Sequence, residues 1–214
     1  MELLNNKILF ISLLIIISTF FSSSPSEDII ITELDSNIVS KEACRFVYGY
    51  KQGKMTSCGL TAIASLLTYY YDTAITENDI IKSFFKDKEA NKDYMVSLQD
   101  LKEIATSFSF KTKAVKVDIE KLNKFITYAP IIIHFQKPST HFTLLIGTYY
   151  NYYILADSGL GLYFMEREEF NNHWSGYCLF VYGQDNLKNK KNIDEAVRLC
   201  SEKIQYMVDI SLYK

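Results

Sequence analysis

The sequence predicts an α+β fold in which a helical first half packs on an antiparallel β-sheet formed by the second half. Before residue 110, apolar residues recur at helical spacing. After it, short runs rich in β-branched and aromatic residues alternate with turn residues. Helices and strands are thus segregated along the chain instead of alternating as in βαβ units, and this favours α+β over α/β.

The first half carries the start signals of several helices. A helix is predicted to begin at Cys58, where apolar residues follow at helical spacing and Thr56 or Ser57 can cap the N-terminus. Capping-box patterns at 76–79 and 97–100 predict two further helices. Residues 43–52 alternate weakly, which predicts a short strand ahead of the first helix.

The second half is expected to form the sheet. Residues 110–117 alternate like a strand, and Asp118 can cap a short helix behind it. Strand-like runs then follow in the order PIIIHF, HFTLLIGTYY, YYILAD, GLYFM and YCLFVYG. Short turns between them predict an antiparallel meander. An amphipathic helix is predicted over 192–207, behind a polar linker.

Length and composition fit one domain of ordinary size with additional segments. The chain has 214 residues, is 48% hydrophobic and 14% aromatic, and carries a net charge of −2. This composition excludes a disordered chain. No Lys/Arg run is interleaved with aromatic residues, so we expect no nucleic-acid partner. Spacings such as CxxC or HExxH are absent, so we expect no metal and no other cofactor.

Residues 1–26 are predicted to be a signal peptide. Lys7 precedes an apolar run at 8–21, and serines follow at 22–24. The run suits the apolar core of a signal peptide and is shorter than the ~20 residues that span a bilayer comfortably. We therefore expect export to the periplasm or medium. An uncleaved anchor formed by residues 8–21 is the alternative, and it would be the chain's one contact with a membrane.

Export also permits disulfides. The four cysteines are Cys44, Cys58, Cys178 and Cys200. If Cys58 is a free nucleophile, the others form at most one bridge. Cys200 could pair with Cys44 or Cys178, and we prefer Cys44–Cys200 because Cys178 lies in a predicted buried strand.

Cys58 has the surroundings of a reactive thiol. It is followed by Gly59 at the predicted start of a helix, where unpaired N–H groups and the positive dipole end lower a thiol pKa. Glycine allows the backbone to approach a substrate closely. The alternative is a small buried hydrophobic residue, which is the commoner use of a free cysteine.

A nucleophilic thiol needs a base and a group that orients the base. Of the three histidines, His141 is preferred because it opens a predicted strand directly after a loop. His134, inside an apolar strand, ranks second, and His173, on a predicted exposed turn or short helix, ranks third.

Asp157 is the expected orienting group. It ends the strand that follows the strand of His141, and antiparallel pairing of the two strands would bring these ends together. The alternative is that Asp157 only begins the tight turn of the DSGLG segment.

These segments resemble a known family. The pieces Q52GKMTSC58G, PIIIHF with H141FTLLIG, ILAD157SGLG and EF170NNHW174SGYCLFV are similar to the bacteriocin-processing cysteine peptidases, the double-glycine leader peptidases of the papain-like superfamily. The similarity runs from about Tyr50 to Val181. It implies a papain-like peptidase fold.

The resemblance also implies a role for each matching residue. Cys58 matches the nucleophile, His141 the general base, Asp157 the residue that orients the histidine, and Gln52 a donor of the oxyanion hole. A glutamine amide N–H and the cysteine backbone N–H can converge on a developing oxyanion. Trp174 matches a tryptophan near the end of the domain, where we expect a packing role.

The sequence departs from the family pattern in two respects. Family members are often fused to a peptide exporter, whereas this sequence has no GxxxxGK[ST] nucleotide-binding motif. Many members carry aspartate where Ser57 precedes the cysteine. The resemblance therefore implies a free-standing, exported relative.

We expect an exported cysteine peptidase that acts on peptide or protein substrates, such as double-glycine-type leaders or other small secreted peptides. Its peptidase domain is predicted over 27–183, followed by a linker and helical extension over 184–214. A catalytically silent peptide-binding module of the cell envelope is one alternative. An acyl or peptidyl transferase that uses the same Cys-His-Asp site is the other.

Overall fold

The computed structural model of the chain describes residues 45–85, 94–182 and 190–212, all within one unit of residues 41–214. The predicted signal segment 1–26, Cys44 and nearly all of the predicted linker lie outside the described residues. Within the described ranges, no helix has the length and apolarity to cross a membrane.

Helices α4 (Cys58–Tyr71), α5 (Glu77–Phe84) and α6 (Leu98–Ser107) follow one another in the first half, as predicted. Both predicted capping boxes are present, at Thr76 with Asp79 and at Ser97 with Asp100. In each box the hydroxyl accepts the N–H of the aspartate, and the carboxylate accepts the N–H of the cap residue. These local hydrogen bonds explain why the two helices begin where the sequence predicted.

The strand predicted within 43–52 is wrong for the described part of that segment, which forms turns. The segment lies against α4 and other loops, and its N–H groups find partners there. Tyr50 N–H donates to Ser65 Oγ at 2.9 Å, and Gln52 N–H donates to the Ser158 carbonyl at 3.0 Å. A loop whose N–H groups are satisfied in this way does not need a strand partner.

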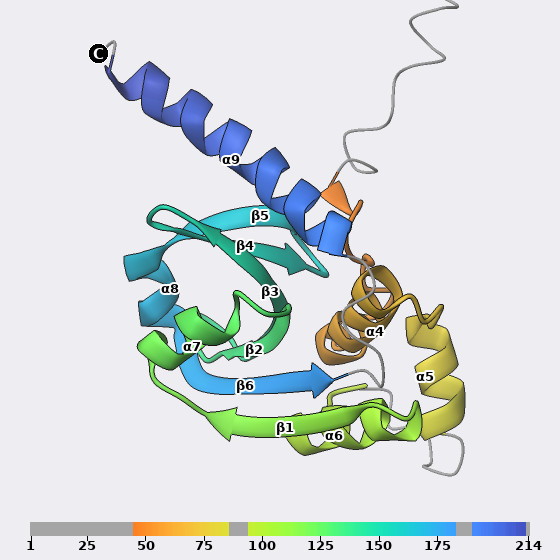
Figure 1. The fold of residues 1–214 in the computed structure, drawn as a ribbon. Helices are drawn as coiled ribbons and strands as arrows, with labels where there is room; N and C mark the ends of the chain where they lie inside the picture. Colours follow the sequence, from red (N-terminus) through yellow and green to blue (C-terminus); the bar gives the residue numbers. More distant parts are fainter. Residues whose placement is uncertain (1–44, 86–93, 183–189, 213–214) are drawn as a thin grey trace, which may run out of the picture. The chain divides into compact units, whose positions relative to one another are not determined.

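The strands form one six-stranded antiparallel sheet in the order β1-β6-β2-β3-β4-β5 (Figure 1). Their bounds are Lys111–Lys116 for β1, Ile131–Phe135 for β2, His141–Tyr149 for β3, Tyr152–Asp157 for β4, Gly161–Glu166 for β5 and Trp174–Tyr182 for β6. Strands β2 to β5 form the predicted meander. The prediction is wrong for β6, which returns to lie between β1 and β2. That position gives the apolar β6 two paired neighbours and leaves the lysine-bearing β1 at the edge, where charge blocks further pairing.

Helices cover both faces of the sheet (Figure 1). Helices α4, α6 and α9 (Lys190–Leu212) pack on one face, and α7 (Ile119–Phe125) and α8 (Arg167–His173) pack on the other. Alternate residues of each strand therefore enter different apolar clusters. The interior of β3 is a continuous buried run because both of its faces are covered.

The division into a helical half and a strand half is only approximate. Helices α7 and α8 lie between strands, and α9 follows the last strand. Two local predictions hold in this region. Asp118 caps α7 by accepting the N–H of Lys121 at 2.8 Å, and His173 lies on a short helix.

The thiol of Cys200 is free, and Cys44, the partner preferred for it, lies outside the described residues. Helix α9 places Cys200, fully buried, in the cluster that contains α4. Cys178 is also free and lies in the cluster on the opposite face of the sheet, so the sheet separates these two thiols.

Candidate active site

The N-terminus of α4 presents Cys58 as the first residue of the helix. Ser57 occupies the N-cap position, but the predicted cap is absent: its hydroxyl donates to the Lys54 carbonyl at 2.9 Å and makes no hydrogen bond to α4. Among the described residues, the backbone N–H of Cys58 also has no backbone acceptor. The first turn of α4 therefore keeps N–H donors beside the thiol, where they can stabilise negative charge.

Gly59 is required by packing. A Cβ atom on this residue would lie 2.5 Å from Val96 Cγ2 and 3.2 Å from Phe142 Cδ2. The glycine thus allows α4 to come close to β3 and to the residues before α6. Gly59 also lines the cavity beside Cys58, so the expectation that its backbone can come close to a substrate stays a prediction.

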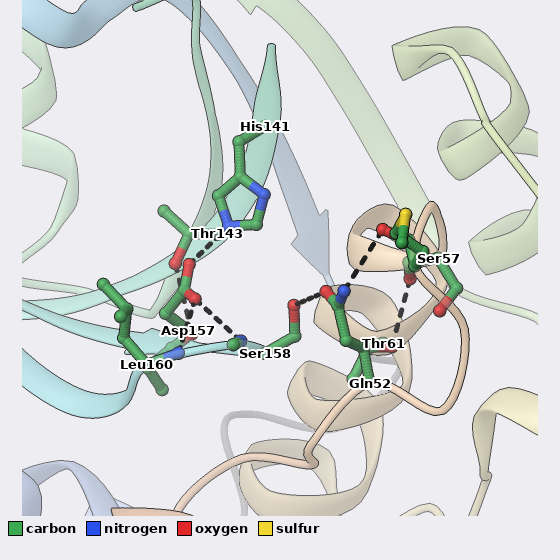
Figure 2. A network of polar contacts seen from close by, with 11 residues as sticks. Gln52, Ser57, Thr61, His141, Thr143, Asp157, Ser158 and Leu160 are labelled. Carbon is green, nitrogen blue, oxygen red and sulfur yellow. Dashed lines mark hydrogen bonds and ion pairs between the residues drawn. The ribbon is translucent and has the colours of Figure 1, made fainter. Parts of the chain in front are cut away.

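His141 opens β3, and its Nε2 lies 2.5 Å from Asp157 Oδ2. The antiparallel register accounts for the contact. Leu144 pairs with Ala156, and continuing by one residue sets Thr143 opposite Asp157. His141 lies two residues before Thr143 on the same face of the sheet, so it is the diagonal neighbour of Asp157. Figure 2 shows Asp157 between His141 and the following turn, and the second ring nitrogen of His141 directed away from the carboxylate.

Asp157 serves the turn as well as the histidine. Its Oδ1 accepts the backbone N–H groups of Gly159 and Leu160 at 2.8 and 2.9 Å, while Oδ2 faces His141. The two interpretations drawn from sequence, turn former and histidine partner, therefore describe the two oxygens of one carboxylate. The side chain of Asp157 is only 4% exposed, so these partners replace water almost completely.

The electrostatics distinguish Cys58 from the other described thiols. Burial alone would raise the pKa of Cys58, but the hydrogen bond and charge of His141 and the backbone N–H groups of Phe142 and Gly59 lower it overall. Burial raises the pKa of Cys178 to about 12 and that of Cys200 to about 11. Cys58 is thus the described thiol whose surroundings favour the thiolate.

The pKa values of His141 and Asp157 shift in directions that favour the charged form of each group. Burial would lower the pKa of His141, but hydrogen bonds to Asp157 and Cys58, together with their charges, raise it to about 10. Burial would raise the pKa of Asp157, but the hydrogen bond and charge of His141 and the two turn N–H groups lower it. These shifts favour a thiolate, an imidazolium and a carboxylate in a row.

Gln52 is held at the same site by Ser158, a residue that the sequence did not single out. Ser158 Oγ donates to Gln52 Oε1 at 2.7 Å, and Gln52 Nε2 donates to the Met55 carbonyl at 3.2 Å (Figure 2). Among the described residues, the second proton of Nε2 has no acceptor. The sequence signal that could have identified Ser158 is its position directly after Asp157. The turn that begins at these two residues orients both His141 and Gln52.

Glu77 is a second residue missed from the sequence. The residue is 9% exposed, and its Oε2 accepts the Gly53 N–H at 2.9 Å and the Thr61 hydroxyl at 2.8 Å. The carboxylate therefore ties the loop that carries Gln52 to the first turns of α4. No local sequence signal marks it, because its partners lie on other elements.

A cavity of about 700 Å³ brings the polar groups together. Gln52, Cys58 and His141 line it, with Asp157 behind His141. Apolar residues make up much of the wall: Met55, Met95, Val96, Leu98 and Phe142. Of the other histidines, His134 also lines the cavity, whereas His173 packs edge-on against Phe135, with ring centroids 6.1 Å apart.

A sequence profile of the Peptidase C39 family matches residues 47–186. The chain belongs to this family. Its members include the double-glycine bacteriocin-processing peptidases, so the resemblance seen in the sequence is confirmed. Trp174 is mostly buried beside Phe170, as expected for a packing residue.

Two curated proteins are similar to the chain at low identity. The chain is 25% identical over 142 residues to the probable functional amyloid protease FapD of Pseudomonas aeruginosa, covering 65% of this chain and 62% of that protein. It is 24% identical over 131 residues to the colicin V secretion/processing ATP-binding protein CvaB of Escherichia coli, covering 61% of this chain and 17% of that protein. The chain thus spans less than two thirds of either relative.

Solved structures of similar fold are family peptidase domains. The peptidase domain of Streptococcus ComA, a bifunctional ABC transporter, superposes with a TM-score of 0.54 at 22% identity, over 64% of this chain and 99% of that one. A double-glycine-motif protease from an AMS/PCAT transporter, solved with its leader peptide, gives 0.52 at 24% identity, over 62% and 89%. These similarities show that the chain has the fold of these peptidase domains, with helices packed on an antiparallel sheet.

Proposed function

We propose that the chain is a cysteine peptidase that uses Cys58, His141, Asp157 and Gln52. The observation that carries the proposal is the His141 Nε2–Asp157 Oδ2 contact of 2.5 Å in a cavity that also holds Cys58 and Gln52. A base, its orienting carboxylate and a helix-start thiol are the elements of thiol acyl transfer.

The geometry supports the following first half of the reaction. Because Nε2 of His141 faces Asp157, Nδ1 is left to hydrogen-bond Cys58. The Cys58 thiolate attacks the scissile carbonyl carbon, and the electron pair of its double bond moves to the oxygen. The Cys58 backbone N–H and the free N–H of Gln52 Nε2 stabilise that oxyanion. As it collapses, the C–N bond breaks and the Nδ1 proton of His141 passes to the departing amine.

The second half hydrolyses the thioester formed between Cys58 and the acyl part of the substrate. Neutral His141 takes a proton from water, the hydroxide adds to the acyl carbon, and the C–S bond breaks to give a carboxylic acid and the thiolate. An amine that replaces water would give acyl transfer by the same steps. The two relatives are named as a probable protease and a secretion/processing protein, and we propose exported peptides or proteins as substrates.

We also propose that residues 1–26 direct export, on the strength of the apolar run at 8–21. The mass of the purified mature protein and its cellular fraction test this step. A retained N-terminus in the cytosolic fraction would contradict it.

The enzymatic proposal is tested with a randomised peptide library and cleavage mapping by mass spectrometry. We expect wild-type cleavage, loss of cleavage in Cys58→Ala and His141→Ala, and retained cleavage in the matched control Cys200→Ala, which removes a buried thiol outside the site. Added hydroxylamine should trap an acyl-enzyme as a hydroxamate. A wild-type chain that binds library peptides without cleaving them would instead be a binding module, and an amide product with an added amine would indicate a transferase.

A further inference from the structure

His134 is the second histidine of the cavity, and its hydrogen bonds determine which ring nitrogen carries the proton. Its Nδ1 lies 3.0 Å from Ser175 Oγ, and that hydroxyl donates its single proton to the His134 carbonyl at 2.9 Å. The Ser175 oxygen must therefore accept from His134, so Nδ1 is protonated. In a neutral imidazole, Nε2 is then an acceptor.

A β-bulge places Ser175 there. The pairing of β2 with β6 is irregular between Ile133 and Phe135, whose partners on β6 are Cys178 and Trp174. The additional β6 residues include Gly176, whose φ of +86° lies in the left-handed region. Bulges near active sites re-aim side chains, and this one turns the Ser175 hydroxyl onto His134. Tyr177, the next residue, reaches the cavity wall.

His134 stays neutral with Nε2 available. Burial and the charge of His141 lower the pKa of His134. Among the described residues, Nε2 has no protein hydrogen-bond partner. It is also not one of the fully buried side-chain atoms that lack a partner, so it is accessible to solvent or to a ligand. Since His134 lines the cavity, that space is where Nε2 can meet a ligand. The ring is held by Ser175 on one side and lies against Phe142, with ring centroids 5.0 Å apart.

We propose that His134 Nε2 accepts a hydrogen bond from one main-chain N–H of the peptide substrate and thereby excludes proline and N-alkylated residues at that position. This inference rests on the proposed peptidase function. His134 pairs across the strands with Phe142, the neighbour of His141, so the recognised residue lies within about two residues of the scissile bond.

The apolar residues of the cavity wall make the acceptor at His134 Nε2 important for peptide binding. The cavity also carries hydroxyl groups, such as those of Ser97, Ser139 and Thr140. The ring of His134 itself lies against Phe142, and Met95, Val96 and Leu98 form further apolar wall, none of which can accept an N–H hydrogen bond strongly. A buried donor or acceptor that loses its partner weakens binding by more than a typical hydrogen bond strengthens it, and an N-methyl group would leave Nε2 without its donor. The acceptor at Nε2 therefore distinguishes peptides by whether they carry an N–H at that position.

The test starts from a peptide that the library experiment identifies as a substrate of the wild-type enzyme. Variants of this peptide are synthesised, each N-methylated at one backbone nitrogen near the scissile bond. We expect one position at which methylation lowers kcat/KM about 10- to 100-fold. Two variants form a matched pair. His134→Asn keeps an N–H for Ser175 and removes the acceptor at the Nε2 position, whereas His134→Gln can set an amide oxygen there.

The expected result is that His134→Asn cleaves the unmethylated peptide about 10- to 100-fold more slowly and no longer responds to methylation at that position. His134→Gln should retain the response. Iodoacetamide labelling of Cys58 at neutral pH should be unchanged in both, which shows a folded site. Cleavage that depends on methylation equally in wild type and His134→Asn would overturn this inference and leave the peptidase intact. A wild-type chain that cleaves no library peptide would overturn the proposed function and this inference with it.

Discussion

Replacing Asp157 by asparagine isolates what the carboxylate does for Cys58. In the wild-type site, Oδ1 of Asp157 accepts the N–H groups of Gly159 and Leu160. An asparagine must keep its oxygen on that side, because an NH2 group there would meet two donors. Its NH2 group is thus forced toward His141, where Nε2 can only accept. The imidazolium then loses its proton at Nε2 and its anionic partner together.

The consequence for the thiol can be worked out from these contacts. The charge of His141 and its hydrogen bond lower the pKa of Cys58 against the effect of burial. Without them, a thiol with the ordinary pKa of ~8.5 is about 3% ionised at pH 7. The rate of alkylation should therefore fall roughly 30-fold relative to a fully ionised thiol. Peptide cleavage should fall by at least as much, because the amine leaving group also loses its proton donor.

The assay measures iodoacetamide labelling of the Cys58 peptide against pH by mass spectrometry. Asp118→Asn is the matched control, because Asp118 also accepts a backbone N–H, caps α7 and lies away from the cavity. Asparagine caps helices well, so this control should label and cleave like wild type. Labelling of Asp157→Asn at the wild-type rate at pH 7 would refute the assignment of Asp157 as the group that holds His141 charged.

Three further results are expected. Cleavage by wild type should fall in acid as the thiolate is protonated, and in alkali as His141 loses its proton near pH 10; a flat alkaline limb would contradict the raised pKa of His141. Ser158→Ala should lower kcat with little change in KM, by less than the roughly 10²- to 10³-fold expected for Gln52→Ala, since Ser158 orients the donor without contacting substrate. Gly59→Ala should destabilise folding by about 1–3 kcal/mol in urea titration, and Val96→Ala should relieve part of that loss, because Val96 Cγ2 lies 2.5 Å from the new Cβ.

Local signals in the sequence predicted the structure well where the determining contacts are also local. The capping boxes at Thr76 and Ser97 and the cap at Asp118 each close within a few residues, and the helices begin there. The weak alternation at 43–52 was misleading, because that segment bonds to Ser65 and Ser158 instead of a strand. Periodicity shows that a face is apolar, but it does not show what covers the face.

The features of the site can likewise be separated into those set by local sequence and those set by long-range contacts. The sequence by itself determined the fold class, the helix start at Cys58 and the juxtaposition of His141 with Asp157, because apolar periodicity and hairpin register follow from residues close in the chain. Only the tertiary structure decided the place of β6, the free thiol of Cys200, and the two serine contacts that orient Gln52 and His134. The Ser158–Gln52 contact spans 106 residues and the His134–Ser175 contact spans 41. Such pairs form only after the sheet has assembled, because packing of the whole domain sets which distant side chains meet.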